Sequence, residues 1–243
     1  MYEGSVAELH RWPVKSLRGE QVDAARFDDR GMAGDRAYAL IDQRERRRGS
    51  VLTVRQNQQM LSWGSAYGST VVDAAAPPVL RGPDGTRWSW TDPDLPGALT
   101  ESFGLPLELR TADGQQDRGP TVLVTIEASR ASLEQELGAP VELDRFRTNV
   151  HLTLDAPAFA EEDWGTGTTL TIGEVELSVV GDRTGPCIRC AVPSWDPHGR
   201  ERWPKIQKWL IEQHENKFGV IMRVTRAGVA RLGDPAWVQL GGN

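Results

Sequence analysis

The chain contains little cysteine and no long apolar run. Cysteine occurs only at Cys187 and Cys190 among the 243 residues, and no segment approaches the roughly 20 apolar residues of a membrane-spanning helix. The N-terminal segment mixes acidic and apolar side chains and does not show the basic-then-apolar order of an export signal. We therefore expect a soluble, cytoplasmic protein that does not bind a membrane.

An excess of positive charge is also absent. The formal net charge is -6 and the isoelectric point is near 5.3, so the protein as a whole has no field that would attract the phosphates of nucleic acid or of anionic lipid. Nucleic acid is therefore not expected as a partner. The basic residues should act locally, at individual sites.

The two cysteines lie in the segment Pro186-Cys187-Ile188-Arg189-Cys190, for which the sequence leaves several possibilities open. A structural zinc ion or an Fe-S cluster needs more ligands than one cysteine pair, and the histidines are scattered, at His10, His151, His198 and His214. A thioredoxin-like redox pair lies between a strand and a helix, whereas Pro193 and Pro197 follow here. Two small buried side chains in a loop are the simplest alternative.

The distribution of apolar residues favours a mostly β fold with a few helices (α+β). Short apolar runs alternate with turn residues, and they predict strands at residues 5–12, 21–27, 36–42, 50–54, 87–91, 141–143, 150–154, 168–172, 175–180, 220–225 and 236–240. Helical spacing predicts helices at 94–103, 127–137 and 202–215. The chain has no G-x-G-x-x-G motif and no regular alternation of strands and helices, which argues against a doubly wound nucleotide-binding fold.

The length of the chain leads us to expect two lobes. The sequence becomes rich in Pro, Gly and Asp from Ala74 to Pro96, and the stretch from Asp92 to about Asp113 is the candidate boundary. We place an N-terminal β-barrel-like lobe at residues 1–97 and a second β-rich domain at residues 98–243.

Two segments of the first lobe place cationic groups beside turns. Lys15 and Ser16 end an apolar run, where they can bind an anion or form a solvated turn. Two glycines are flanked by arginines in the segment from Arg30 to Arg36. This segment can form an amide nest for a phosphate or a tight turn with an exposed ion pair.

Two segments of the second lobe have the same character. The segment Arg145-Phe146-Arg147-Thr148-Asn149 alternates as a strand does, which predicts that Arg145, Arg147 and Asn149 share a face able to clamp a phosphate. In the cysteine segment the cation of Arg189 lies beside Cys190, where it would favour the thiolate over the thiol.

The order of these segments resembles the MOSC family, the proteins related to the C-terminal domain of molybdenum-cofactor sulfurase. The series P-V-K-S, G-D-R, R-F-R-x-N and P-C-x-R-C runs through the chain, together with Leu52-Thr53-Val54-Arg55-Gln56 in the first lobe and with Phe218-Gly219 and Gly233-Asp234 near the end. The chain looks nearest to the branch that includes the mitochondrial amidoxime-reducing components and their bacterial relatives.

The resemblance implies an N-terminal β-barrel lobe followed by a MOSC β-barrel, with a molybdenum cofactor (molybdopterin carrying Mo) between them. It also implies the reduction of N-hydroxylated compounds, of amidoxime or hydroxylamine type, by removal of oxygen. By position, Cys190 matches the catalytic, metal-binding cysteine, and Cys187 receives only a packing role. The residues that match cofactor contacts are Lys15, Ser16, Arg36, Arg147, Asn149, Arg189 and Cys190. A soft thiolate suits a metal already held by sulfur, and cations suit the pterin's phosphate.

Two departures from the family pattern bear on the substrate. The segment Asp196-Pro197-His198-Gly199 is one residue shorter than its usual counterpart, and Ile221 lies where relatives can have a tyrosine that contacts the cofactor. The sequence shows no flavin or Fe-S motif. The resemblance implies a small N-hydroxylated substrate, and the lack of such a motif leads us to expect electrons from a separate donor protein of the ferredoxin, flavin or cytochrome type.

Other functions stay open at the level of sequence. In a non-redox sulfur-carrier or cofactor-binding module, Cys190 would carry a persulfide or the lobe would store cofactor. A cysteine hydrolase would need a histidine near the thiol, for which His198 is the candidate. Asp182, Asp196 and His198 could donate protons or form turns. The arginine-rich run at 44–48 could bind an acidic electron donor or be a solvated hairpin tip.

Overall fold

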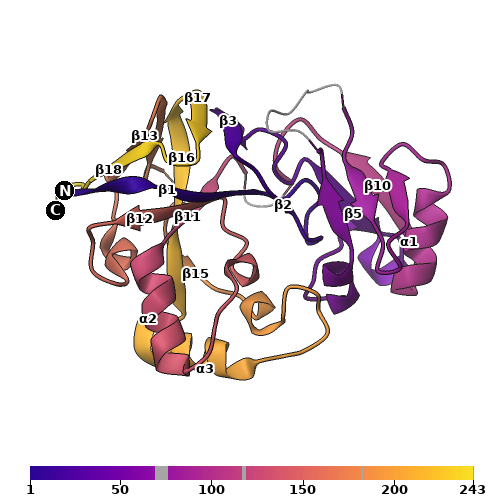
Figure 1. Cartoon of the computed structure of the whole chain (residues 1–243). Coiled ribbons are helices and arrows are strands. Elements are labelled where there is room, and N and C mark those ends of the chain that lie inside the picture. The colour runs from indigo at the N-terminus through magenta and orange to yellow at the C-terminus, as the bar shows by residue number, and fades with distance from the viewer. Residues whose placement is uncertain (69–75, 117–118, 182, 243) are drawn as a thin grey trace.

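Seven strands of the chain close into a β-barrel, the left-hand lobe in Figure 1. The computed structural model describes residues 1–68, 76–116, 119–181 and 183–242. The barrel strands follow the order β11 (Val122–Ile126), β12 (Val150–Leu154), β1 (Tyr2–Arg11), β18 (Pro235–Gln239), β13 (Thr169–Ile172), β14 (Val175–Ser178) and β16 (Lys217–Arg226), and β16 pairs with β11 to close the ring. Two short strands extend this sheet, since β2 (Glu20–Gln21) pairs with β1 and β15 (Gly185–Ile188) pairs with β16.

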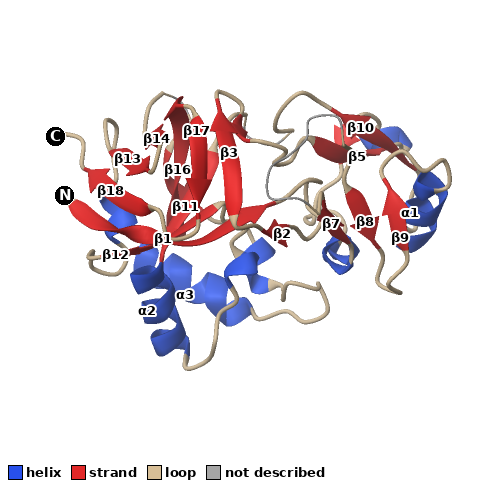
Figure 2. Cartoon of the chain, turned by 45° about the horizontal axis from the view of Figure 1, so that its top comes forward, coloured by secondary structure: helices blue, strands red, loops and turns tan. Residues whose placement is uncertain are grey.

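One pair of neighbours in the barrel, β11 and β12, is parallel. Parallel neighbours need a crossover connection, and α2 (Glu127–Leu137) provides it. Figure 2 shows α2 on the outside of the barrel, beside α3 (Pro204–His214). Both helices pack outside the barrel, and side chains of the strands fill most of its interior.

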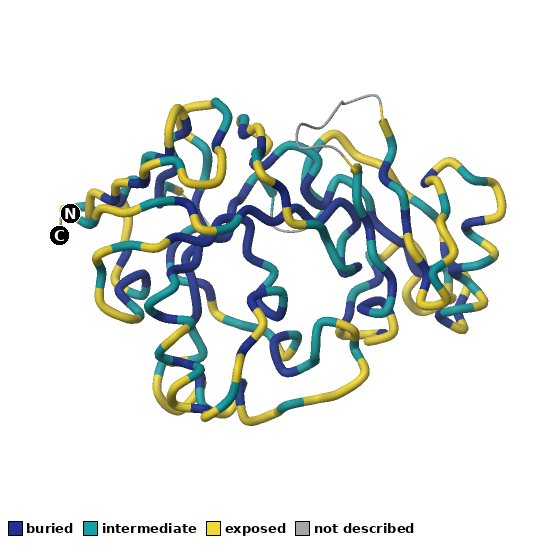
Figure 3. The backbone as a smooth tube through the Cα atoms, in the orientation of Figure 1, coloured by how far each residue is buried: buried dark blue, intermediate teal, exposed yellow. Residues whose placement is uncertain are grey.

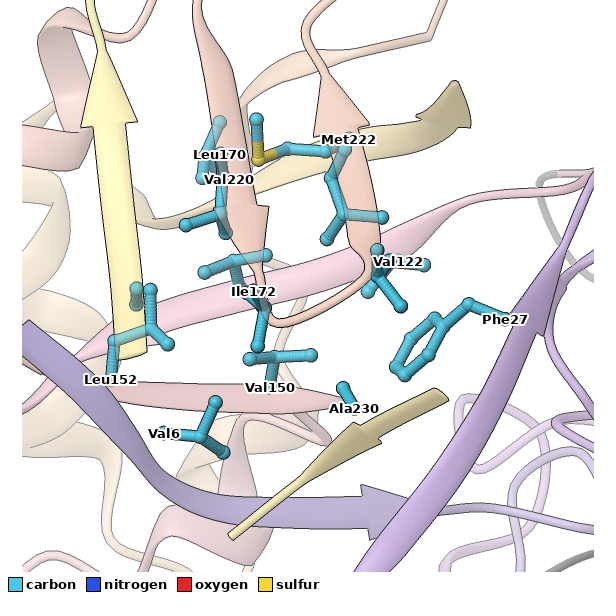
Figure 4. Close-up of a cluster of buried hydrophobic side chains, with 14 of the residues drawn as sticks. Val6, Phe27, Val122, Val150, Leu152, Leu170, Ile172, Val220, Met222 and Ala230 are labelled. Atoms are coloured by element: carbon cyan, nitrogen blue, oxygen red, sulfur yellow. The ribbon is translucent and has the colours of Figure 1, made fainter. Parts of the chain in front are cut away.

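The barrel interior is a single apolar cluster. Figure 4 shows side chains from several strands meeting there, among them Val6, Leu152 and Ile172. A small sheet of β17 (Gly228–Arg231), β3 (Ala24–Asp28) and β4 (Gly31–Met32) adds Phe27 and Ala230 to the same cluster. Since burial contributes about 25 cal/mol per Å² of apolar surface, this cluster is a main source of the lobe's stability.

The first lobe has its own core between two small sheets. One sheet contains β10 (Leu107–Thr111), β5 (Tyr38–Asp42) and β6 (Ser50–Val51), and the other contains β7 (Gly64–Ala66), β8 (Val79–Arg81) and β9 (Arg87–Ser89). The helix α1 (Leu95–Phe103) packs into this core, as does β10. The domain boundary predicted between residues 97 and 98 falls inside α1. The division of the chain into domains at this point stays a prediction.

A third apolar cluster lies between the barrel and its outer helices. Phe146 stacks on Phe218 with ring centroids 3.9 Å apart, and Leu133 and Ile206 pack around them from α2 and α3. Short 3-10 helices complete this lobe: η3 (Leu143–Arg145), η4 (Ala160–Asp163) and η5 (Val192–Ser194). The first lobe has two more, η1 (Glu45–Arg47) and η2 (Gln58–Ser62). The third cluster fixes the segment that runs from η3 to β12.

Several segments of the chain join the lobes, among them the end of β1 and the loop after β15. The end of β1 is buried and continues as buried chain through residues 12–14 into the first lobe, as the dark blue path in Figure 3 shows. The loop after β15 crosses back to the first lobe, where Gly199 packs against η2. A Cβ atom at Gly199 would lie 2.6 Å from the carbonyl oxygen of Gln58, and the residue has a φ of +70°. Only glycine therefore allows this contact without strain.

The structure confirms the mostly β fold and all three predicted helices. The range of α2 is the predicted one, and Gly104 and Gly138 end α1 and α2 in the left-handed conformation. The strand predicted at 141–143 is wrong, because η3 begins at Leu143. Seven strands of the structure were not predicted: β4, β7, β8, β10, β11, β15 and β17. In the part of the chain that the structure describes, no helix has the length and apolar character needed to span a bilayer.

We expect Leu152→Ala to lower the free energy of unfolding by about 2–5 kcal/mol, because it leaves a cavity in the barrel core. Leu152 is fully buried, whereas Thr153 beside it on β12 is exposed. Urea unfolding followed by circular dichroism measures the change, with Thr153→Ala as the control, expected to lose less than about 1 kcal/mol. Equal losses in the two variants would contradict the assigned direction of these side chains.

Candidate active site

A cavity of about 440 Å³ lies where the two lobes meet. All seven site residues predicted from the sequence line it: Lys15, Ser16, Arg36, Arg147, Asn149, Arg189 and Cys190. The first lobe also contributes residues 53–56, and much of the remaining wall is apolar: Val54, Leu123, Phe146, Ile188, Val192 and Ile221. The structure thus brings together segments that are far apart in the sequence. The roles of the seven residues stay a prediction.

Backbone hydrogen bonds hold together the two first-lobe loops that carry Lys15 and Arg36. The N–H of Arg36 donates to Trp12 O (2.7 Å), and the N–H of Lys15 donates to Tyr38 O (2.8 Å). Ser16 and Arg36 have φ values of +72° and +51°. This left-handed conformation costs roughly 1–3 kcal/mol for a residue with a Cβ atom, and such residues cluster at functional sites.

The guanidinium of Arg36 connects the lobes. It pairs with Asp35 and donates to the carbonyl oxygen of Arg147 (3.1 Å) across the lobe junction. Asp35 in turn accepts from the N–H of Trp12 (2.9 Å) and from Nε2 of Gln115 (3.1 Å). Burial makes this ion pair sensitive to the loss of either partner.

The segment from Arg30 to Arg36 is a tight turn in which the N–H of Asp35 donates to Met32 O (3.0 Å). The exposed ion pair expected here is that of Arg30, which contacts Asp28 at 2.6 Å. The second ion pair, between Asp35 and Arg36, is buried. The turn therefore has one solvated end and one end that belongs to the cavity.

Asn149 is fully buried and hydrogen-bonded at both ends of its amide. Its Oδ1 accepts from the N–H of Leu123 (3.1 Å) and from Arg36 (3.4 Å), and its Nδ2 donates to His10 O (3.2 Å). The backbone of Asn149 bonds the same two strands, since its N–H donates to Leu123 O (2.8 Å) and its carbonyl accepts from the N–H of His10 (2.9 Å). Asn149 thus fixes β1, β11 and Arg36 to one another.

The predicted common face of Arg145, Arg147 and Asn149 is wrong. Arg145 ends η3 and donates to Trp195 O (2.7 Å), outside the cavity lining. Arg147 has a φ of +56°, so the chain reverses its direction where a strand would continue. Its guanidinium lies 4.3 Å from the centroid of the Trp12 ring and donates to Leu17 O (2.8 Å). Arg147 therefore reaches the first lobe, and Arg145 instead holds the loop that follows Cys190.

Both cysteines line the cavity, and they differ in burial. Cys187 is buried on β15 and packs against Leu123 and Ile221, which agrees with a packing role. Arg189 donates to the Cys187 sulfur (3.3 Å) and to Phe146 O (2.5 Å). The Nε of Arg189 is buried, and in the described parts of the chain it finds no hydrogen-bond partner. Cys190 follows β15 and is only partly buried.

The Cys190 thiol has a lowered pKa. Burial alone would raise its pKa, but the charge of Arg189, the backbone N–H of Val192 and the side chain of Arg55 together bring it below the ordinary thiol value. A larger thiolate fraction makes a better nucleophile and a better ligand for a soft metal.

Arg55 is a site residue that the sequence analysis did not single out. It lies in the first lobe, lines the cavity, and lowers the pKa of the Cys190 thiol of the second lobe. Its place in the Leu52–Gln56 segment could have marked it as a site residue, because that segment is part of the family resemblance. No local pattern shows which distant residue it acts on. The thiol is thus flanked by one cation from each lobe, Arg55 and Arg189.

Other candidates lie elsewhere. His198 does not line the Cys190 cavity, so the geometry gives no support to a cysteine hydrolase. Asp196 accepts the N–H groups of Arg200 (2.6 Å) and Glu201 (3.1 Å), as in a turn. Asp182 lies outside the described residues. Within those residues, no group of three or more His, Cys, Asp or Glu is placed to hold a metal ion.

Comparisons with known proteins define the family. Residues 3–93 match the family model described as the MOSC N-terminal beta barrel domain, and residues 114–237 match the one described as the MOSC domain. The chain therefore belongs to the MOSC family, whose domains are associated with the molybdenum cofactor.

Individual relatives are distant. Mitochondrial amidoxime reducing component 2 of Bos taurus is 22% identical over 291 aligned positions, covering 96% of this chain and 83% of that protein. Mitochondrial amidoxime-reducing component 1 of Mus musculus is 22% identical over 292, covering 97% and 82%. Among solved structures, the YuaD protein from Bacillus subtilis is similar over 100% of both chains, with 13% identity and a TM-score of 0.49.

We expect Arg55→Met to raise the pKa of Cys190, because it removes a hydrogen bond and a positive charge from the thiolate. The pH dependence of iodoacetamide alkylation measures this in cofactor-free protein that also carries Cys187→Ser. The half-maximal rate should move to higher pH. Arg46→Met, at an exposed position in η1, should leave it unchanged; a profile that is the same in all three proteins would contradict the assigned contact.

Proposed function

We propose that this protein is a molybdenum-cofactor-dependent oxidoreductase that reduces small N-hydroxylated compounds. One observation carries the proposal: a single cavity between the lobes is lined by a thiol of the second lobe and by cations of both lobes. The similarity to proteins named for amidoxime reduction supports the substrate class.

The donor set of the cavity fits such a cofactor. A thiolate at Cys190 suits a metal that is already bound by the sulfurs of a pterin. Lys15 and Arg147 supply charge-assisted hydrogen bonds for a phosphate, one from each side of the lobe junction. The buried Nε of Arg189 has no hydrogen-bond partner among the described residues, so a polar group in the cavity would satisfy it.

When bound, the cofactor supplies the redox chemistry by which an N–OH group, given two electrons and two protons, loses its oxygen as water. The chain's own residues position and shield this chemistry. Arg189 and Arg145 fix the loop on both sides of Cys190, through Phe146 O and Trp195 O. Leu123 and Ile221 form an apolar wall that excludes water from part of the cavity. Ile221 is part of this wall, so the wall selects substrates by their size and by apolar contact.

The electrons come from a separate donor protein, of the ferredoxin, flavin or cytochrome type. The cations around the thiol, Arg55 and Arg189, carry no redox function themselves. An artificial reductant such as reduced methyl viologen replaces the donor in an assay.

A non-redox cofactor-binding or sulfur-carrier module is the second candidate, since the same cations and thiol would also store a cofactor. Metal content does not separate the two functions. Turnover of a model amidoxime with an artificial reductant does.

We expect Cys190→Ser to lose most amidoxime reduction, because a hydroxyl is a harder and poorer ligand for the metal. Cys187→Ser should keep most of its activity, because Cys187 packs among apolar side chains on β15. The assay measures benzamidine formed from benzamidoxime with reduced methyl viologen. Equal losses in the two variants would instead indicate a dithiol mechanism.

We expect Lys15→Met and Arg147→Met each to weaken cofactor retention by about tenfold or more, the effect of losing one charge-assisted hydrogen bond. Pterin and molybdenum are determined per chain after purification from a cofactor-competent host. Lys208→Met is the control, because Lys208 is exposed on α3. Wild-type pterin content in both site variants, with folding checked by circular dichroism, would show that these residues do not hold the cofactor.

A further inference from the structure

A second and larger cavity, of about 690 Å³, lies outside the proposed active site. It shares no lining residue with the first cavity. Its wall is formed by the β7–β8 edge of the first lobe and by the turn around Gly199. Its charged lining residues are mostly cationic: Arg18, Arg81, Arg87 and Arg200, with His198 beside them. Among the lining residues that the structure describes, Asp84 is the one carboxylate.

These arginines come from separate segments that the fold holds in place. The backbone of Arg18 is bonded on both sides, since its N–H donates to Trp63 O (2.9 Å) and its carbonyl accepts from the N–H of Ser65 (2.9 Å). Arg81 ends β8, and Arg200 follows Gly199, whose turn packs against η2. The cluster is therefore built by the tertiary structure and is not one charged run of sequence.

Three of the four arginines have no carboxylate partner within the described residues. No hydrogen bond or ion pair joins the side chain of Arg81, Arg87 or Arg200 to a carboxylate there. Asp84 is engaged in its own turn, where its carboxylate accepts from the N–H (2.9 Å) and Oγ1 (2.7 Å) of Thr86.

Arg18 is the least exposed of the four arginines. Its Nη2 donates to Ser62 O (3.3 Å), but its Nε is buried and has no partner in the described chain. Burial is the main cause that lowers the pKa of Arg18; among the nearby charges Asp144 has the largest effect and raises the pKa, while Arg81 and Arg200 lower it. Like charges gathered at a partly buried site repel one another, and a bound anion would relieve that repulsion.

The chemistry of the wall selects one class of anion. Guanidinium groups present paired N–H donors that match the oxygens of a phosphate. The wall also contains Gly64 and Gly85, where an added Cβ atom would have only arginine side chains nearby, at 3.7 and 3.8 Å, so their backbone is open to the cavity. The volume lies in the range of about 300–1,000 Å³ that is typical of small-molecule sites, and the concave shape suits a small ligand better than a flat protein surface.

We propose that this cavity, which we call the arginine cavity, is a binding site for a small phosphate-type anion with at least two negative charges, such as an organic phosphate or a diphosphate. The site is independent of the proposed reductase function. Arg81 and Arg200 bind the anion from the first lobe and from the turn after the cysteine segment, and Arg18 lines the same cavity.

Isothermal titration of the full chain with inorganic pyrophosphate, at constant ionic strength, tests the proposal. Arg81→Met and Arg200→Met should each weaken binding by about tenfold or more, since each loses a charge-assisted contact. Arg81 and Arg200 are both exposed, so the two variants should keep the thermal unfolding midpoint of the wild type. Arg46→Met, which removes the same charge from the exposed tip at η1, should bind like the wild type.

Three results would overturn the proposal. The first is the absence of saturable pyrophosphate binding by the wild type. The second is an equal loss of binding in Arg46→Met, which would reduce the effect to overall charge. The third is a fall in pterin content in Arg81→Met, which would make the cluster part of the cofactor site. Because the titration needs no activity, a protein that lacks reductase activity but binds pyrophosphate would separate the two proposals.

Discussion

The buried amide of Asn149 is the interaction on which the two lobes and their cavity depend. Its side chain and backbone both bond β1 and β11, and its Oδ1 also accepts from Arg36 of the first lobe. A buried donor or acceptor that loses its partner costs about 1–3 kcal/mol. The register of the barrel strands and the position of the first lobe are thus set by the same residue.

The geometry of the cavity follows from this junction. Ser16, Arg36 and Arg147 are all in the left-handed conformation, which isolated residues of these types avoid. Each is held there by contacts across the junction or within the adjoining loops, such as Arg36 to Arg147 O and Arg147 to Leu17 O. The stability of the two cores therefore offsets the free-energy cost of the left-handed backbone conformation in the wall of the cavity. The same contacts hold the cations in fixed orientations in the protein without a ligand.

Features with a local cause could be predicted from the sequence, and those that depend on distant contacts could not. The helix at 127–137 carries its own apolar spacing and its glycine cap. The alternation at 145–149 suggested a strand, but the hydrogen bonds of Arg36 and Arg189 to this segment impose another conformation. Arg55 was missed for the same reason, since it acts on Cys190, which lies 135 positions further along the chain. The order of the motifs predicted which segments meet, although not how each side chain is directed.

We propose that the cavity between the lobes holds a molybdenum cofactor. Elemental analysis for molybdenum together with pterin fluorescence, on the full chain purified from a cofactor-competent host, tests this directly. We expect molybdenum and pterin in equal amounts, close to stoichiometric with the chain. A well-folded protein without pterin, from a host whose other molybdenum enzymes are loaded, would contradict it.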